Sequence, residues 1–506
     1  MKLAGLAERA GVACPDAEDA TVTGFAIDHR KVAPGTVFGA FRGAKFNAED
    51  FIPAAIESGA VAVVTRPDVP VKGAVRIASE EPRRTFAMLA AQFFTPVPEM
   101  LVAVTGTNGK TSTAEMTRQI WRMCGERAAS IGTLGVTTPD GSISTGLTTP
   151  DIVTFLSNMS GLAREGVTHV AYEASSHGLS QYRNEGLRVS ACAFTNFSRD
   201  HLDYHGTMDE YFAAKMRLFD EVVERGAPAI IWDGGEICEW TRRAIEHAIS
   251  QDLRVRTVGE RGEFLRLAAR EATPLGQTIK IEHEGWERTI KLPLIGAYQA
   301  ANALCAAALA ISTGSEPAQV FDAVSRLQPV LGRLERAAIT PVGAPIYIDY
   351  AHTPDALEAA IAALRPHVDE AKGGKLIVVF GAGGDRDKGK RGPMGTAAAY
   401  GAEVVIVTDD NPRGEKPKNI REAILRGLGE IDAGARMDSG FDIGDRREAI
   451  AKAIELAGES DIILVAGKGH EQGQIVGSGE NMRVLPFDDV QVARECAAES
   501  AKGANA

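Results

Sequence analysis

The sequence predicts an α/β protein of three domains. With 506 residues, the chain is long enough for about three domains of ordinary size. Short apolar runs typical of buried strands alternate with helical patterns along most of the chain, which favours mostly parallel sheets. The alternation is interrupted at residues 96–98, which contain two prolines, and again near Gly332 and Arg333. We therefore expect a small α/β domain at residues 1–95, a central domain at 96–333 and a C-terminal domain at 334–506.

The composition excludes several classes of protein. The chain is 44% hydrophobic and 24% charged, and its net charge of −12 argues against a general nucleic-acid or anionic-membrane binder. No apolar run is long enough to span a membrane, and Glu8 and Arg9 interrupt the only apolar stretch near the start. The six cysteines are scattered without metal-like spacing, so we expect reduced, mostly buried thiols. These features favour a cytoplasmic monomer that acts on small molecules, without nucleic acid or membrane insertion.

The first domain reads only as a small α/β unit. Helical spacing covers residues 3–10, and an alternating strand pattern covers 21–28. A Pro-Gly turn then leads into a second strand, a helix begins at residues 51–52 and ends near 59, and residues 60–65 return as a strand. Asp28 and Arg30 are compatible with a surface ion pair.

The most informative stretch lies at residues 100–123. An apolar run, 100–104, is followed by Gly106-Thr107-Asn108-Gly109-Lys110-Thr111-Ser112 and then by a helical pattern over 113–123. Backbone N–H groups in such a loop form a cradle for phosphate oxygens. Lys110 would contact the β- and γ-phosphates, and the Thr111 hydroxyl would bind Mg²⁺. The loop is shorter than the usual phosphate loop, so the alternative is a glycine turn beside a surface lysine. The order of strand, loop and helix favours a P-loop ATPase-like central sheet that binds a nucleoside triphosphate.

Two further polar clusters follow predicted strands of the central domain. Residues 167–172 lead into Glu173, and residues 192–195 lead into a segment that contains His201. Ligands of open α/β sheets lie at the carboxyl ends of strands, so both side chains are candidates to hold Mg²⁺ with Thr111. The alternatives are a helix cap or ion pair for Glu173 and an ordinary hydrogen bond for His201. A predicted helix over 211–223 carries Lys215, whose pattern alone indicates a solvated lysine.

The remaining chain predicts a β-hairpin over 277–294, a long alanine-rich helix from 296, and a Rossmann-like C-terminal sheet. Its strands are expected at 345–349, 376–380, 403–407 and 461–465. The glycine-rich turn at 381–388 lacks the G-x-G-x-x-G spacing, which excludes an NAD site. Arginines 183, 386 and 413 are candidates to bind substrate carboxylates, with surface ion pairs as the alternative. An ATP site between two other α/β domains indicates an ATP-dependent enzyme with two further substrates.

At this point the chain resembles the Mur ligases of peptidoglycan synthesis over all three domains. The motifs that carry the resemblance are Gly106-Thr107-Asn108-Gly109-Lys110-Thr111, Glu173-x-Ser175-Ser176-His177-Gly178-Leu179, Thr195-Asn196-x-Ser198-Arg199-Asp200-His201-Leu202-Asp203-Tyr204-His205-Gly206 and Asp410-Asn411-Pro412-Arg413. The resemblance implies addition of meso-2,6-diaminopimelate to the D-glutamyl γ-carboxylate of UDP-MurNAc-L-Ala-D-Glu. ATP would activate that carboxylate as an acyl phosphate, which the amine then attacks.

The resemblance also implies site residues. The catalytic set would be Lys110, Lys215, Glu173 and His201. Magnesium would be held by Thr111, Glu173, His201 and Lys215, the last as N6-carboxylysine. ATP would contact Gly106, Thr107, Asn108, Gly109, Lys110, Thr111, Ser112, Asn302, Arg333, Asp349 and His352. The UDP-linked substrate would contact Ile27, His29, Thr148, Thr149, Ser175, Gln181 and Arg183. Diaminopimelate would contact Arg386, Asp410, Asn411, Pro412, Arg413, Gly467 and Glu471.

The first domain departs from the family pattern, and three rivals stay open. The family's Asp-Ser-Arg is Asp28-His29-Arg30 here, and its Asp-Gly-His is replaced by residues 47–50, Asn-Ala-Glu-Asp. The nearest rival is a sibling ligase that adds lysine or D-Ala-D-Ala, against which Arg413 argues. The others are a folate polyglutamylating ligase, which lacks a UDP-binding domain, and an ATPase switch or motor.

Overall fold

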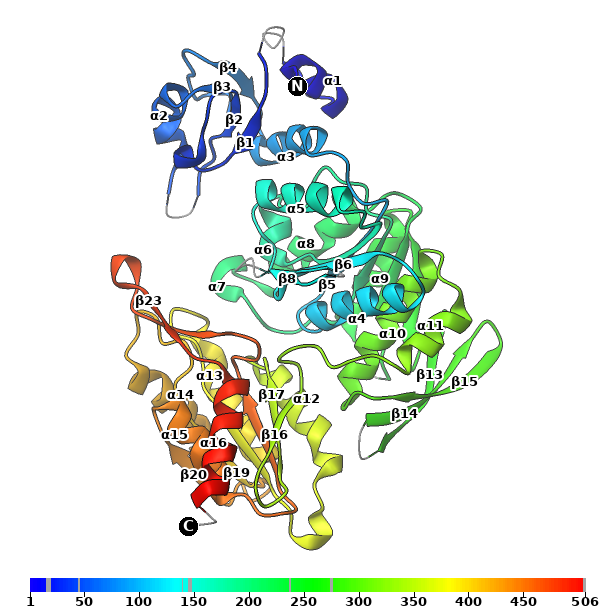
Figure 1. Cartoon of the computed structure of the whole chain (residues 1–506), viewed down its shortest axis with the longest axis vertical. Helices are drawn as coiled ribbons and strands as arrows, with labels where there is room; N and C mark the ends of the chain where they lie inside the picture. Colours follow the sequence, from blue (N-terminus) through cyan, green and yellow to red (C-terminus); the bar gives the residue numbers. More distant parts are fainter. Residues whose placement is uncertain are drawn as a thin grey trace.

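The computed structural model describes residues 1–14, 20–43, 46–138, 140–143, 148–235, 238–273 and 276–503. Three sheets, each with its own helices, follow one another along the long axis of the molecule (Figure 1). The N-terminus lies at one end, with the blue first domain, and the C-terminus lies at the other, with the orange and red elements. No described helix is both long enough and apolar enough to cross a membrane.

The first sheet has four parallel strands in the order β1-β2-β3-β4. Its elements are α1 (Leu3–Ala10), β1 (Gly24–Ala26), β2 (Thr36–Gly39), α2 (Ile52–Glu57), β3 (Ala60–Thr65), β4 (Val75–Ala78) and α3 (Pro82–Phe93). The predicted helix at 3–10 and strand at 60–65 are confirmed, whereas the strand expected over 21–28 is only three residues long. The Asp28–Arg30 surface ion pair is present at 2.7 Å.

The central sheet has eleven strands in the order β15-β14-β13-β12-β11-β10-β5-β9-β6-β7-β8. Its strands are β5 (Met100–Thr105), β6 (Ala128–Gly132), β7 (Gly135–Thr137), β8 (Ser142–Ile143), β9 (His169–Glu173), β10 (Ala191–Phe194), β11 (Pro228–Trp232), β12 (Arg254–Gly259), β13 (Leu265–Thr273), β14 (Gly276–His283) and β15 (Trp286–Leu292). Within this order the seven neighbouring strands β13-β12-β11-β10-β5-β9-β6 pair parallel throughout, confirming the predicted parallel sheet. The predicted hairpin at 277–294 is β14 with β15.

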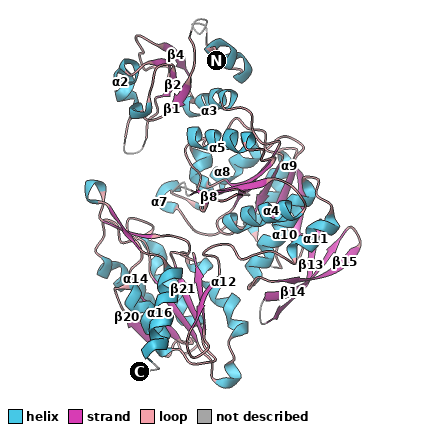
Figure 2. Cartoon of the chain, in the orientation of Figure 1, coloured by secondary structure: helices cyan, strands magenta, loops and turns pink. Residues whose placement is uncertain are grey.

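Helices cover both faces of the central sheet (Figure 2). They are α4 (Lys110–Met123), α5 (Ile152–Arg164), α6 (Ser176–Ser180), α7 (Leu202–His205), α8 (Met208–Arg217), α9 (Glu239–Ser250), α10 (Ala297–Ser312) and α11 (Pro317–Val324). The alanine-rich α10 is almost entirely buried, because its small side chains let α4 and the sheet approach closely. Two helix predictions need correction: α4 begins at Lys110 rather than 113, and the helix expected over 211–223 becomes a π-helix at Leu218–Val222.

The C-terminal sheet has the order β16-β17-β21-β18-β19-β20, parallel except for β16. Its elements are β16 (Glu335–Ile339), β17 (Pro345–Asp349), α12 (Pro354–Leu364), β18 (Leu376–Phe380), α13 (Arg391–Gly401), β19 (Val404–Val407), α14 (Pro417–Gly429), β20 (Ser439–Asp442), α15 (Arg446–Leu456), β21 (Ile462–Ala466) and α16 (Asp489–Gly503). A separate hairpin joins β22 (Gly473–Val476) to β23 (Arg483–Pro486). All four predicted strands are present within one residue of their expected bounds.

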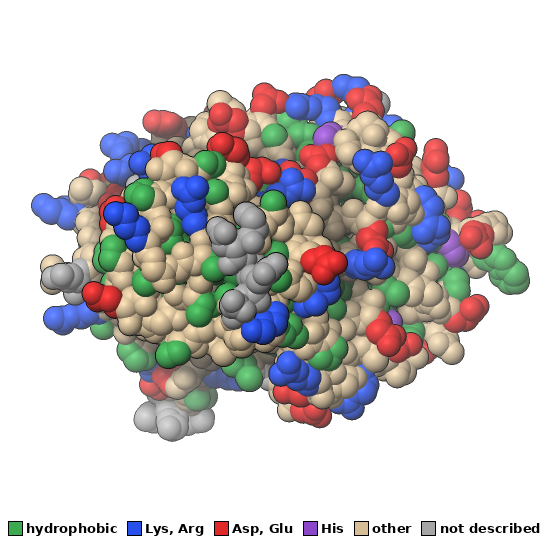
Figure 3. Space-filling model, turned by 90° about the horizontal axis from the view of Figure 1, so that it is seen from above, with side chains coloured by type: hydrophobic (Ala, Val, Ile, Leu, Met, Phe, Trp, Pro, Cys, Tyr) green, Lys and Arg blue, Asp and Glu red, His purple; other side chains and the backbone are tan. Residues whose placement is uncertain are grey.

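The surface carries acidic and basic side chains together. On the face that Figure 3 shows, seen from the first-domain end, red and blue side chains are interspersed rather than gathered by sign. Among the six cysteines, three are buried, two are half-buried and Cys238 is exposed, so the expectation of mostly buried thiols holds only in part.

Candidate active site

The phosphate loop connects β5 to α4 and is shaped by two glycines with positive φ. Gly106 has φ +142°, and a Cβ atom there would lie 2.0 Å from Thr195 Oγ1. Gly109 has φ +85°, and a Cβ atom there would lie 2.3 Å from Asn302 Oδ1. Neither position has room for a side chain, and both use backbone angles that glycine adopts most easily. Asn108 N–H donates to Asn196 Oδ1 at 2.9 Å, which ties the loop to the end of β10.

Two lysines converge on this loop. Lys110 Nζ donates to the carbonyls of Gly106 at 3.0 Å and Thr107 at 2.7 Å, and Lys215 Nζ donates to the same Gly106 carbonyl at 2.6 Å. Lys215 is 1% exposed and lies over the Tyr211 ring, so it is not the solvated lysine that its helical pattern indicates. Burial, reinforced by the charge of Lys110, lowers the pKa of Lys215 well below its usual range. This shift favours the neutral, nucleophilic amine over the ammonium.

Glu173 ends β9 beside the turn that follows β6. Its Oε1 accepts the Thr133 N–H at 2.6 Å, and its Oε2 accepts the Thr133 hydroxyl at 3.2 Å. A Cβ atom on Gly132 would lie 2.1 Å from Glu173 Oε1, so this glycine allows the carboxylate to approach. The Thr133 hydroxyl also lies 3.5 Å from that of Thr111. Among the described residues, the carboxylate has hydrogen-bond donors but no ion-pair partner, and it caps no helix.

His201 sits at the end of the segment after β10 with φ +53°. Its N–H donates to Asp200 Oδ1 at 2.9 Å, and its Nε2 lies 3.4 Å from Asp200 Oδ2. Burial lowers the pKa of His201 to about 3. At neutral pH the imidazole is therefore uncharged, and a ring nitrogen can offer its lone pair to a cation.

These side chains line a first cavity of about 410 Å³ between the central and C-terminal domains. Its walls include residues 107–112 of the phosphate loop, and the other predicted ATP and magnesium residues that line it are Glu173, His201, Lys215, Asn302, Arg333, Asp349 and His352. Arg333 Nη2 donates to the Thr111 hydroxyl at 3.2 Å, while its guanidinium stacks 4.4 Å from the Tyr350 ring. Of the predicted ATP contacts, only Gly106 does not line the cavity, although its carbonyl accepts hydrogen bonds from Lys110 and Lys215.

A second cavity of about 370 Å³ adjoins the first. It is lined by Thr148, Thr149, Ser175, His177, Arg183, Asp200, His201, Asp203, Tyr350, His352, Gly383, Arg386, Asp387, Lys390, Asp410, Asn411, Arg413, Gly467 and Glu471. Six residues line both cavities: Thr148, Ser175, Asp200, His201, Tyr350 and His352. Four of the seven residues predicted for the UDP-linked substrate and six of the seven predicted for diaminopimelate thus line one space, directly beside the phosphate loop.

The C-terminal side of the second cavity carries both signs of charge. Arg413, with φ +49°, donates from Nη1 to the Gly384 carbonyl at 3.0 Å; its backbone N–H donates to the Ile475 carbonyl in β22, and its C=O accepts the Gly477 N–H just after that strand. Arg413 makes no ion pair with a described residue, so the surface ion-pair alternative does not hold for it. Burial, followed by the charge of Arg386, lowers the pKa of the Arg413 guanidinium, as expected where two cations face an anion site. Asp387, Asp410 and Glu471 supply the acidic side.

The central-domain side is built around Arg183. Its Nη1 donates to the Thr149 carbonyl at 2.8 Å and its Nη2 donates to Gln181 Oε1 at 2.7 Å. The Thr149 hydroxyl in turn lies 2.9 Å from Ser175 Oγ. Gln181 does not line the cavity and instead orients the arginine, and Pro412 likewise supports the loop without lining it.

Comparison with known proteins identifies the family. Residues 104–310 match the Mur ligase middle domain, and residues 332–469 match the Mur ligase glutamate ligase domain. The chain belongs to the Mur ligase family. It is 55% identical over 494 residues, 98% of each chain, to the UDP-N-acetylmuramoyl-L-alanyl-D-glutamate–2,6-diaminopimelate ligase of Zymomonas mobilis, and 48% identical over 484 residues to that of Caulobacter vibrioides, covering 94% and 95% of the chains.

Solved structures show the same architecture. The structure of a UDP-N-acetylmuramoyl-L-alanyl-D-glutamate–2,6-diaminopimelate ligase is 31% identical, covers 98% of both chains and has a TM-score of 0.69. The MurF ligase from Thermotoga maritima in complex with ADP is 18% identical, covers 96% of this chain and 100% of its own, and has a TM-score of 0.62. The three-domain Mur ligase architecture predicted from the motifs is confirmed.

The donor set of this Mur ligase fits magnesium. Mg²⁺ prefers oxygen ligands and keeps several waters. The Thr111 hydroxyl and the Glu173 carboxylate supply oxygens, and neutral His201 adds a nitrogen. Among the described residues no group of three or more His, Cys, Asp or Glu side chains could hold a metal by itself, so phosphate oxygens and water would complete the shell. An ammonium at Lys215 does not fit a cation site, whereas a carbamate would.

Ile27 and His29 line neither cavity; they lie in the first domain, which Figure 1 shows at the opposite end of the molecule from the C-terminal domain. His29 stacks on Phe51 with ring centroids 4.3 Å apart, and Phe46 also stacks on Phe51, with centroids 4.9 Å apart. Ile27 is partly buried against the first-domain core. A ligand that reached these residues and the central cavities together would have to be long.

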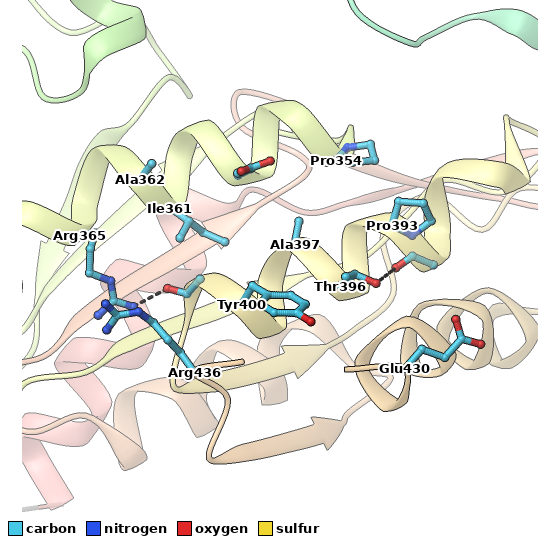
Figure 4. Close-up of a pocket in the computed structure, with 13 residues that line it drawn as sticks. Pro354, Ile361, Ala362, Arg365, Pro393, Thr396, Ala397, Tyr400, Glu430 and Arg436 are labelled. Atoms are coloured by element: carbon cyan, nitrogen blue, oxygen red, sulfur yellow. Dashed lines mark hydrogen bonds between the residues drawn. The ribbon is translucent and has the colours of Figure 1, made fainter. Parts of the chain in front are cut away.

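Several Mur ligase site residues escaped the sequence analysis: Thr133, Tyr298, Tyr350, Asp387 and Lys390. Tyr298 donates to Asp349 Oδ2 at 3.2 Å, and burial raises the pKa of Asp349. Asp200, Asp203 and His177 were quoted only as parts of motifs. A wider groove of about 700 Å³ between α12 and α13 carries none of the predicted residues, and Figure 4 shows it lined by Ile361, Ala362, Ala397 and Tyr400.

Proposed function

We propose that this Mur ligase uses ATP to join meso-2,6-diaminopimelate to the D-glutamyl γ-carboxylate of UDP-MurNAc-L-Ala-D-Glu. The observation that carries the proposal is the junction of the two cavities. One is lined by the phosphate loop and the other by residues predicted for the acceptor peptide and the amino acid. The full-length relatives of Zymomonas mobilis and Caulobacter vibrioides bear the name of the ligase for this reaction.

We assign a role in binding to each domain. Residues 1–95 hold the UDP moiety near Ile27 and His29, residues 96–333 hold ATP and the peptide, and residues 334–506 hold diaminopimelate. Both cavities are formed within one chain, so we propose that the enzyme acts as a monomer. ATP and a UDP-sugar are cytoplasmic metabolites, which favours a cytoplasmic location.

The reaction proceeds in two displacements. A γ-carboxylate oxygen of the peptide attacks the γ-phosphorus of ATP, the bond to the bridging oxygen breaks, and ADP leaves. The amine nitrogen of diaminopimelate then attacks the acyl carbon, the amine loses a proton, and the carbon–oxygen bond to phosphate breaks. Lys110, the loop N–H groups and Arg333 hold the phosphates, and the two adjoining cavities align the three reactants. Neutral His201 and buried Asp200 lie where the two cavities meet.

Magnesium held by Thr111, Glu173 and His201 would neutralise phosphate charge. We further propose that Lys215 is carbamylated. Its neutral amine nitrogen would attack the carbon of CO₂ and release one proton, giving a carbamate. The modified nitrogen keeps one N–H, so its bond to the Gly106 carbonyl can persist. The new carboxylate would face the first cavity, which Lys215 lines, and could bind a second cation.

The deciding experiment measures phosphate release from ATP with UDP-MurNAc-L-Ala-D-Glu, with meso-diaminopimelate or L-lysine as the amine. We expect release that depends on diaminopimelate, formation of a UDP-tripeptide, and a preference over lysine of tenfold or more. Equal use of lysine would overturn the role of Arg413 but keep the ligase. Release that needs neither the amine nor the UDP-sugar would overturn the proposed function.

A further inference from the structure

Lys468 is a fully buried charged side chain behind the diaminopimelate pocket. Strand β21 ends at Ala466, and Gly467 has φ +115°, so the chain turns sharply there. Lys468 follows with an exposed fraction of 0%. It does not line the second cavity, although Gly467 before it and Glu471 after it do. Burying an ammonium is costly unless its surroundings compensate its charge.

Three pocket residues provide that compensation. Lys468 Nζ donates to Asn411 Oδ1 at 3.0 Å and to Glu471 Oε2 at 3.4 Å, and it lies 3.7 Å from Asp410 Oδ1. Asn411 Nδ2 also donates to Glu471 Oε2 at 2.8 Å, while Asn411 Oδ1 accepts the Ile475 N–H at 2.8 Å. One ammonium therefore holds Asp410, Asn411 and Glu471 together, whereas Asp387, the other acid that the C-terminal domain presents to this cavity, lies next to Arg199.

The charge balance of the pocket follows from this arrangement. Diaminopimelate differs from lysine by a carboxylate beside the far ammonium. Arg386 and Arg413 supply positive charge for that carboxylate, and Asp410 and Glu471 supply negative charge for the ammonium. Without Lys468, two acids would face the far end of the amino acid. With Lys468 behind them, Asp410 and Glu471 carry a single net negative charge, which matches one ammonium, while the formal charges of Asp387 and Lys390 in the same lining cancel.

We propose that Lys468 is a positioning residue for amino-acid selectivity: it orients Asp410, Asn411 and Glu471 and sets the charge of the pocket to suit a zwitterionic substrate end. The inference rests on the proposed function, because it assumes that this pocket takes diaminopimelate. Removal of the ammonium would make the pocket more negative and release its side chains. The extra carboxylate of diaminopimelate would then be repelled, whereas lysine has no such group.

The test compares Lys468→Gln, Lys468→Met and Lys468→Arg with the wild type, in ligation assays with diaminopimelate and lysine. The amide of Lys468→Gln can still donate hydrogen bonds but lacks the charge, so it separates charge from packing. We expect KM for diaminopimelate to rise about tenfold or more, with KM for ATP within threefold. The preference for diaminopimelate over lysine should fall about tenfold, and Lys468→Arg should recover most of it.

Arg365→Met is the matched control. It also removes a cation that is paired with an acid of the same domain, Glu403, but Arg365 lines the groove between α12 and α13 and not the diaminopimelate pocket. It should leave the ratio of the two amines unchanged. If Lys468→Met does not fold, Lys468→Gln carries the test. An unchanged preference in Lys468→Gln, or a parallel rise of KM for all three substrates, would overturn the inference. A wild type that does not use diaminopimelate would instead overturn the proposed function.

Discussion

Thr133 offers a sharp test of how the first cavity is held together. Its backbone N–H and its hydroxyl grip the two oxygens of Glu173, at 2.6 and 3.2 Å, and the hydroxyl also lies 3.1 Å from that of Thr148. The substitution Thr133→Val keeps the shape of the side chain and the backbone bond. It removes only the hydroxyl, which leaves Glu173 Oε2 without this donor.

The size of the effect follows from the bond that is lost. A hydrogen bond to a charged group contributes about 1.5–3 kcal/mol, and the length of 3.2 Å places this one near the lower figure. About 1.5 kcal/mol corresponds to roughly a tenfold change. Since Glu173 is proposed to hold magnesium with ATP, kcat/KM for ATP should fall about tenfold, while KM for diaminopimelate should stay within threefold.

The assay is steady-state phosphate release with ATP and Mg²⁺ varied and the other substrates saturating. Thr133→Ser keeps the hydroxyl and should retain most of the activity. Thr138→Val makes the same exchange at a half-buried threonine whose hydrogen bonds to described residues stay within its own turn, so it should behave as wild type. Wild-type kinetics for Thr133→Val, or equal losses for Val and Ser, would refute the reasoning about Glu173.

Three further predictions concern Lys215, Arg413 and His470. Lys215→Ala should lose most of its activity and regain part of it with added short carboxylates; full activity in the plain variant would contradict the carbamate. Arg413→Met should lower kcat/KM for diaminopimelate by about tenfold or more and that for lysine by less than threefold, and equal losses would make Arg413 structural. Burial lowers the pKa of His470 to about 4 in the folded chain, against about 6.5 when unfolded. Between about pH 6.5 and pH 4 the imidazole is therefore neutral in the folded chain and protonated in the unfolded chain. As the pH is lowered through this range, the free energy of unfolding should decrease by up to about 1.4 kcal/mol per pH unit. Urea midpoints at pH 7 and 5 measure this fall, which should be smaller in His470→Gln; an unchanged difference would contradict the assignment.

The buried strands were predictable because a strand covered on both faces is a continuous apolar run. The runs at 345–349 and 376–380 coincide with β17 and β18 residue for residue. The edges of the central sheet were less visible. Strands β7 and β8 are three and two residues long, too short for any periodic pattern to develop.

Site residues in recognisable motifs were predictable, and isolated ones were not. Thr133 is a single threonine after an apolar run, and only the placement of β6 beside β9 brings it to Glu173. Lys215 was misjudged from its helical pattern, because burial depends on α8 packing beside the phosphate loop. Lys468 stands in a turn of glycines and polar residues that reads as exposed, yet three side chains enclose it.

The position of Arg333 affects how well the central domain can function when it is separated from the C-terminal domain. The residue belongs to the connection between the central and C-terminal domains, yet its guanidinium touches the Thr111 hydroxyl and stacks on Tyr350. Its carbonyl accepts from Gln299, and the next N–H, that of Leu334, donates to Asp349. A protein cut at this connection would keep the whole phosphate loop but lose the contacts by which Arg333 joins the loop to Tyr350 of the C-terminal domain. The isolated central domain should therefore bind nucleotide more weakly than the intact chain, even though the loop sequence is complete.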